Sequence, residues 1–125
     1  MSRFNKIDHD PRNNQLTVGA GCVFDEIYKF IRPKGYNIVG GGGSVGLSGW
    51  IMGGGYSLKT NQYGLGIDNL DQVQIVLPDG KVVKATKNIN SDIFWAIRVC
   101  LRLNLRVNIE QLTHFELRAA GITLV

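Results

Sequence analysis

The sequence predicts a single soluble domain of the α+β class, in which a mixed or antiparallel sheet carries flanking helices. Its 125 residues fit one domain, and an apolar fraction of 44% is enough for an ordinary soluble core. Segments with the two-residue alternation of strands outnumber helical ones, and two of them are joined by the tight turn Pro78–Gly80, as in an antiparallel hairpin. In addition, nine of the sixteen glycines lie within residues 40–55, which predicts a site lined by backbone.

The first third of the chain is predicted to contain a strand, a helix and a second strand. Gln15–Val18 is a short β-like run that glycines end. Apolar side chains follow helical spacing over residues 23–32, with acidic residues in the first turn, and Pro33 and Gly35 then end the helix. The short strand Asn37–Val39 leads directly into the glycines.

The elements after residue 55 read as a loop, a hairpin and a helix. Residues 56–66 are loop-like, and alternation resumes over residues 68–76. After the turn at Pro78–Gly80, residues 81–86 return as the second strand of the hairpin. Residues 90–92 offer N-cap side chains for a helix that extends through Ile97.

Residues 98–112 fit a strand better than a helix. In a helix, Arg98, Arg102 and Arg106 would place like charges on one face, which costs roughly 0.2–0.5 kcal/mol per pair. As a strand over residues 101–109, aliphatic side chains share one face and polar side chains the other. A last strand is predicted over residues 113–118.

Charge and composition exclude several classes of function. The net charge of +4 comes from scattered Lys and Arg without a basic cluster, so nucleic-acid binding is not expected. No apolar run is long enough to span a membrane, and residues 1–12 are polar, unlike a signal peptide. Cys22, Cys100, His9 and His114 are isolated from one another, which argues against a metal site and a catalytic triad.

The glycine window, residues 40–55, is the candidate functional site. Glycine adds no side chain to a core, so a run this dense indicates backbone conformations or close contacts that other residues do not allow. A bound cofactor is the usual reason, since bare N–H groups bind phosphates and a missing Cβ admits a flat ring. A flexible linker is the alternative, but the window interleaves Val45, Leu47, Trp50, Ile51 and Met52, whereas linkers are polar.

Known phosphate-binding motifs match the window only in part. Residues 41–46 satisfy GxGxxG after a strand, and Asp68 lies about twenty residues on, as in a nicotinamide-dependent Rossmann unit. A Rossmann turn must open a long helix, however, and Gly49 and Gly53–Gly55 break this one after at most two turns. Asp68 is better interpreted as a turn or capping residue. No Walker loop is present, because no Gly-Lys-Ser/Thr follows.

The order of motifs resembles another group, the FAD-linked oxidases with a vanillyl-alcohol-oxidase or p-cresol-methylhydroxylase (PCMH) type of FAD-binding domain, especially the berberine-bridge-like branch. The likeness covers roughly residues 15–98. It is carried by Val18–Gly21, the helix with Tyr28 that ends at Pro33–Gly35, Val39–Gly41, Ser44–Ser57, Asn61–Leu65, Asp68–Asn69, Val76–Gly80 and Asp92–Ala96.

The resemblance implies the second subdomain of a PCMH-type FAD-binding domain, spanning residues 1–125, with FAD as cofactor and a small organic molecule as substrate. In such enzymes the flavin carries the chemistry and dioxygen reoxidises it. Backbone N–H groups from Gly41 to Gly46 would hold the cofactor, and Trp50 and Tyr56 would shape the pocket or pack behind it. The positions assigned to FAD are Gly41, Gly42, Gly43, Ser44, Val45, Gly46, Gly49, Trp50, Gly53, Gly54, Gly55 and Tyr56.

Three departures from the family limit the expected function. The Arg-Ser-Gly-Gly-His loop that grips the pyrophosphate is missing, and Gly42 and Gly43 stand where relatives with a cysteinyl flavin carry cysteine. Residues 98–112 are aberrant relative to the family, and the first FAD subdomain and the substrate domain are not in the chain. We therefore expect an FAD-binding fragment of an oxidoreductase that is inactive by itself. The alternative is a non-catalytic binding module, or a decayed gene product that retains the fold.

Overall fold

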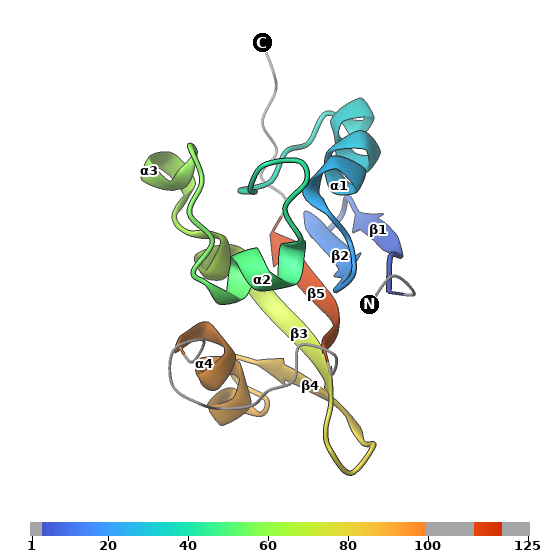
Figure 1. The fold of residues 1–125 in the computed structure, drawn as a ribbon, viewed down its shortest axis with the longest axis vertical. Coiled ribbons are helices and arrows are strands. Elements are labelled where there is room, and N and C mark those ends of the chain that lie inside the picture. Colours follow the sequence, from blue (N-terminus) through green and yellow to red (C-terminus); the bar gives the residue numbers. More distant parts are fainter. Residues whose placement is uncertain (1–3, 100–111, 119–125) are drawn as a thin grey trace.

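A computed structural model describes residues 4–99 and 112–118, and its strands form one antiparallel sheet (Figure 1). The sheet has five strands in the order β1-β2-β5-β3-β4, and every neighbouring pair is antiparallel. This arrangement confirms the predicted α+β class. The strands are β1 Ile7–Asp10, β2 Gln15–Gly19, β3 Leu70–Val76, β4 Val82–Thr86 and β5 Leu112–Arg118.

Short helices accompany this sheet. In Figure 1, α1 lies at the end near β1 and β2, α2 crosses the middle of the sheet, and α4 lies beside β4. The α-helices are α1 Phe24–Ile31, α2 Leu47–Met52, α3 Thr60–Tyr63 and α4 Ser91–Val99, and the 3₁₀ turns are η1 Arg32–Lys34 and η2 Gly66–Asn69. The longest of them has nine residues, so their stability depends on packing against the sheet.

The core lies between the sheet and these helices. On β2, Leu16 and Val18 are fully buried and alternate with half-buried polar residues. On β3, the register against β5 shifts after Leu70, and this bulge allows both Leu70 and Val73 to face the core although they are three residues apart. Phe24 of α1 is fully buried against this layer. Each such side chain contributes roughly 1.5–3 kcal/mol to stability.

Strand β5 holds the two halves of the sheet together, because it pairs with β2 on one side and β3 on the other. Its Leu117 stands opposite Leu16 of β2 and Leu70 of β3, and is itself buried. A strand from the end of the sequence is thus the centre of the sheet.

Most of the elements predicted from the sequence are confirmed. They include β2, α1, the hairpin of β3 and β4, α4 and β5, each within two residues of the predicted bounds. Gly35 adopts a φ of 80° after η1, and Gly80 a φ of 83° in the hairpin turn, as the turn chemistry required. The helix in the glycine window is α2, which has six residues, within the predicted limit of two turns.

Three predictions of elements were wrong or incomplete. Asn37–Val39 is buried but forms no extended strand; Asn37 makes only an isolated β-bridge, and its side-chain oxygen accepts the N–H of Ile38 at 2.9 Å. The predicted loop over residues 56–66 contains α3, and β1 was missed because its run is short and polar. The strand predicted over residues 101–109 lies outside the described residues.

Candidate functional site

Backbone hydrogen bonds join the glycine window to the start of α1. The N–H of Phe24 donates to the carbonyl of Val45 at 3.1 Å, and the N–H of Asp25 donates to the carbonyl of Gly43 at 2.9 Å. In the other direction, the N–H of Leu47 donates to the carbonyl of Cys22 at 3.0 Å. These bonds hold residues 43–47 in place, and they also occupy the N–H groups that would otherwise make the start of α1 an anion site.

Packing inside the chain explains three glycines of the window. A Cβ atom at Gly41 would lie 2.9 Å from Cδ1 of Trp50, a distance that real Cβ atoms do not show. At Gly40 it would overlap the hydroxyl of Tyr28, and at Gly43 it would overlap the carboxylate of Asp25. At Gly40 and Gly41 the neighbours include the aromatic rings of Phe24 and Trp50, so the chain needs glycine there whether or not a cofactor binds. At Gly43 the neighbour is the end of the exposed Asp25 side chain, which can move aside, so the need for glycine is weaker.

A turn explains two more glycines. Gly54 and Gly55 have φ angles of 100° and 76°, which residues other than glycine rarely adopt. A Cβ atom at Gly55 would also lie 2.9 Å from the Cα of Gly66. These glycines reverse the chain after α2 and do not by themselves indicate a ligand.

The remaining glycines of interest, Gly42, Gly46 and Gly49, have open surroundings; we call these three the open glycine face. All three are exposed and none has a positive φ. A Cβ atom at Gly46 or Gly49 would meet nothing within 4 Å, and one at Gly42 would make an ordinary contact of 3.7 Å with Val45. Nothing in the described part of the chain requires glycine here, so the missing side chains leave space for something outside it.

Trp50 packs behind the window. Its ring meets that of Phe24 edge-on at a centroid distance of 4.9 Å, and its indole N–H donates to the carbonyl of Tyr56 at 3.0 Å. The same ring occupies the space that Cβ atoms at Gly55 and Gly66 would need. Of the two roles considered from the sequence, this position corresponds to the aromatic that packs behind the site.

The other predicted site residues lie at the surface. Ser44, Val45 and Gly53 are exposed near the open glycine face, and Tyr56 is 70% exposed. Ser48, which was not assigned to the site, is buried, and its hydroxyl donates to the carbonyl of Ala20, which anchors α2 to the end of β2.

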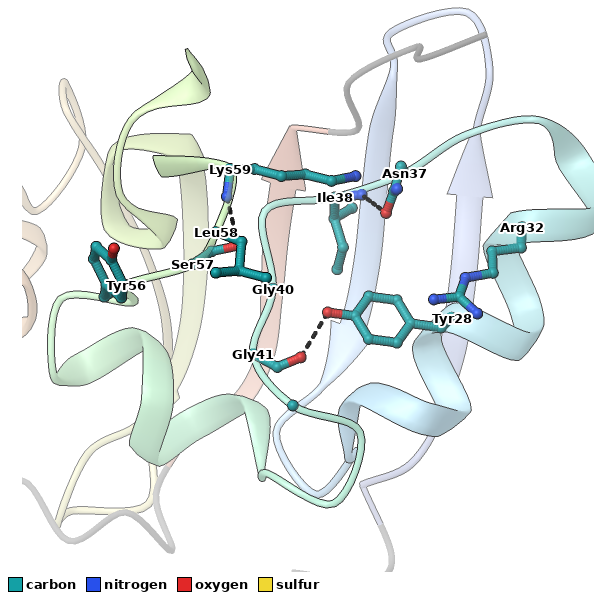
Figure 2. Close-up of a pocket in the computed structure, with 11 residues that line it drawn as sticks. Tyr28, Arg32, Asn37, Ile38, Gly40, Gly41, Tyr56, Ser57, Leu58 and Lys59 are labelled. Atoms are coloured by element: carbon teal, nitrogen blue, oxygen red, sulfur yellow. Dashed lines mark hydrogen bonds between the residues drawn. The ribbon is translucent and has the colours of Figure 1, made fainter. Parts of the chain in front are cut away.

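A pocket of about 430 Å³ opens beside the window (Figure 2). Its walls are Tyr28 and Arg32 on one side, the segment 37–42 in the middle and residues 56–59 on the other. The Tyr28 hydroxyl donates to the carbonyl of Gly41 at 2.7 Å, which fixes the ring as part of the wall. A pocket of this size suits a small molecule or part of a cofactor.

Cationic side chains dominate the electrostatics of this pocket. The pKa of Lys59 is lowered from its usual value, first by burial and second by the positive charge of Arg32. The Arg32 guanidinium carbon lies 4.9 Å from the centre of the Tyr28 ring. The pKa of Tyr28 is raised, mainly by burial, so its hydroxyl stays protonated.

Sequence reasoning missed Arg32, Asn37 and Lys59, which line this pocket. Arg32 follows the last turn of α1 and reads as an ordinary basic residue at a helix end, and Lys59 lies in a stretch predicted to be a loop. No local pattern marks either residue. Asp68 does have the predicted capping role, since its carboxylate accepts the N–H of Leu65 at 3.0 Å.

A comparison with protein families identifies the group. Residues 1–86 match the model of a family described as an FAD binding domain. The chain belongs to this family. The relatives of this FAD-binding domain include the FAD-linked oxidoreductase phmC of Phaeosphaeria nodorum, which is 42% identical over 85 residues, covering 66% of this chain and 19% of the relative. An FAD-dependent monooxygenase of Arthrobotrys oligospora is 32% identical over 119 residues, covering 94% of this chain and 22% of the relative.

Solved structures support the same assignment. BBE-like 1 of Physcomitrella patens superposes with a TM-score of 0.84 at 27% identity, over 98% of this chain and 26% of that one. Glucooligosaccharide oxidase of Acremonium strictum gives a TM-score of 0.78 at 25% identity, over 95% of this chain and 24% of that one. The predicted resemblance to berberine-bridge-like FAD-binding domains is confirmed, and FAD is the cofactor of the family. The chain spans about a fifth of the length of the curated relatives it matches.

The described residues fit part of an FAD site. The open glycine face provides surface without side chains, and no acceptor within the described part of the chain pairs with the N–H groups of Gly42, Ser44 and Gly46. Across residues 4–99 and 112–118, no three His, Cys, Asp or Glu side chains gather as metal ligands. Over those same ranges, no helix has both the length and the apolar character needed to cross a bilayer.

Proposed function

We propose that this chain forms one wall of the FAD site of an FAD-linked oxidoreductase, and that the open glycine face is the surface in contact with the cofactor. The open space at Gly46 and Gly49 carries the proposal, because glycine is present there without any need inside the described chain. Membership of the FAD-binding domain family supplies the identity of the ligand.

The chain's residues would bind and position the cofactor. Gly46 and Gly49 allow backbone to approach a flat ring closely, while the N–H groups of Gly42 and Ser44 are available to donate hydrogen bonds to phosphate or carbonyl oxygens. Trp50 and its contact with Phe24 support this surface from behind. Val45, which is 39% exposed, offers an apolar contact beside the glycines and helps to exclude water.

The reaction would follow from the cofactor. Bound FAD supplies the redox chemistry, taking two electrons from a C–H, C–O or C–N bond of a small organic substrate. We extend the proposal to dioxygen as the final electron acceptor, since several solved structures that resemble this chain are oxidases, among them glucooligosaccharide oxidase. The substrate machinery belongs to parts of the relatives that this chain does not match.

We expect weak binding and little turnover by these 125 residues alone. The chain covers 19% of phmC, so many of the contacts that a full-length relative makes to FAD are not supplied by it. The entropic cost of binding is nevertheless the same. Measurable oxidase turnover with a trapped FAD would contradict this expectation.

Titration of the chain with FAD, followed by flavin fluorescence and visible absorption, tests the proposal. Saturable binding that Gly46→Leu abolishes, and that the exposed Lys87→Leu leaves unchanged, would support it. Circular dichroism would show whether both variants keep the fold. Absence of binding up to about millimolar FAD, or equal binding by Gly46→Leu, would refute it and favour a non-catalytic binding module.

A further inference from the structure

Two cations from separate parts of the chain face the same pocket. Arg32 follows α1, and Lys59 precedes α3. Figure 2 shows the Lys59 side chain extending over the pocket in the direction of Asn37, with Arg32 and Tyr28 on the same wall and Tyr56 on the opposite side. The influence of Arg32 on Lys59 shows that the two charges lie within electrostatic range of each other.

Neither cation has a salt-bridge partner among the described residues. The salt bridges found there join Lys81 to Asp79 and Arg98 to Asp68. On α1, Asp25 directs its carboxylate toward Gly43. Two like charges held near one another without a counter-ion favour an anion between them.

The remaining polar groups of the pocket are mainly hydrogen-bond donors. The Asn37 oxygen is used by the N–H of Ile38, which leaves the side-chain NH₂ as the group available to a ligand. The Ser57 oxygen accepts the N–H of Lys59 at 3.3 Å, so its hydroxyl hydrogen remains to donate. The Tyr28 hydroxyl already donates to Gly41. Donors from a guanidinium, an ammonium, an amide and a hydroxyl match the acceptor oxygens of a phosphoryl or carboxylate group.

We propose that the pocket between α1 and α3 is an oxyanion-binding site in which Arg32 and Lys59 bind the anion and Asn37 and Ser57 orient it. The anion has two possible sources, namely the phosphates of a nucleotide such as FAD and the carboxylate of an acidic substrate. The first source rests on the proposed function, and the second is independent of whether this chain alone holds FAD.

Isothermal titration of the 125-residue chain with inorganic pyrophosphate, ADP and benzoate tests the site without any need for enzyme activity. Wild type is compared with Lys59→Met and Arg32→Met, which keep an unbranched apolar stem and remove the charge. Lys87→Met, an exposed lysine beyond β4, is the matched control. Each pocket variant should weaken binding about tenfold or more, because a charge-assisted hydrogen bond is lost, and the control should leave it unchanged.

The ligands distinguish the two sources. Binding of pyrophosphate and ADP that depends on Lys59, together with Lys59-dependent FAD binding, assigns the pocket to nucleotide phosphates. Binding of benzoate that depends on Lys59, with FAD binding unaffected by Lys59→Met, assigns it to an acidic substrate. Both results support the site. If none of the three anions binds at concentrations up to about 10 mM, or if both pocket variants bind them as wild type does, the proposal is overturned. Loss of FAD binding in Gly46→Leu with retained anion binding would separate this site from the open glycine face.

Discussion

Gly49→Ala is expected to stabilise the chain and to weaken FAD binding at the same time. Gly49 lies within α2 and a Cβ atom there would meet nothing within 4 Å, so alanine restores helix propensity without strain. The gain in the free energy of unfolding should be about 0.5–1 kcal/mol. The same methyl group would project from the open glycine face into the space proposed for the cofactor, and we expect the dissociation constant for FAD to rise about tenfold, equivalent to ~1.4 kcal/mol.

Gly41→Ala is the matched control, since its Cβ atom would lie 2.9 Å from Trp50 and the variant should lose about 1–3 kcal/mol of stability. Urea unfolding followed by circular dichroism measures stability, and fluorescence titration measures FAD affinity. A less stable Gly49→Ala would refute the conclusion that the position is open. A more stable variant with wild-type affinity would show that the cofactor does not contact this face.

Three further outcomes are expected. Asp68→Ala should lower stability by about 0.5–2 kcal/mol in urea unfolding, because the N–H of Leu65 loses its cap. Arg98→Met should cost far less, since its salt bridge to Asp68 is exposed. Equal losses of stability in the two variants would contradict this ranking. Gly80→Ala should cost about 1–2 kcal/mol, measured by thermal unfolding, since φ is 83° in the hairpin turn, and a neutral effect would show that the turn relaxes easily. Burial raises the pKa of the Cys22 thiol from 9.0 to about 11. Above pH 9 the thiol therefore ionises in the unfolded chain first, and stability should fall between pH 9 and 11. The pH dependence of urea unfolding should be smaller in Cys22→Ala, and an unchanged pH dependence would rule out this cause.

The sequence predicted the elements whose signals are local. Helix α1 has apolar spacing over two turns and the β3–β4 hairpin has a turn with Pro78 and Gly80, so short segments contain all the information needed. The strand predicted at Asn37–Val39 failed because its apolar residues indicated burial alone: the pairing stops at an isolated bridge at Asn37, and the N–H of Ile38 is bonded locally to the Asn37 side chain. Strand β1 failed because a short edge strand carries almost no hydrophobic pattern.

The candidate site was predictable as a region but not residue by residue. Glycine density located the window, and the order of motifs identified the family that the comparison confirms. The sequence treated Gly41 and Gly46 alike, although the first is required by packing against Trp50 and the second is open. Lys59 and Arg32 were not predicted at all, because each is an unremarkable basic residue in its own segment.

The sequence by itself determined the α+β class of this protein, with a sheet that could be mixed or antiparallel, and predicted a backbone-lined site, since alternation, capping and turn chemistry act over a few neighbouring residues. Only the tertiary structure decided which glycines face a possible ligand. Whether a Cβ atom fits depends on Tyr28 and Asp25, which reach the window from α1, and on Trp50, which packs back against it from α2. The same is true of the pocket, where Arg32 and Lys59 share an electrostatic environment because the fold brings the end of α1 and the segment before α3 to the walls of one pocket.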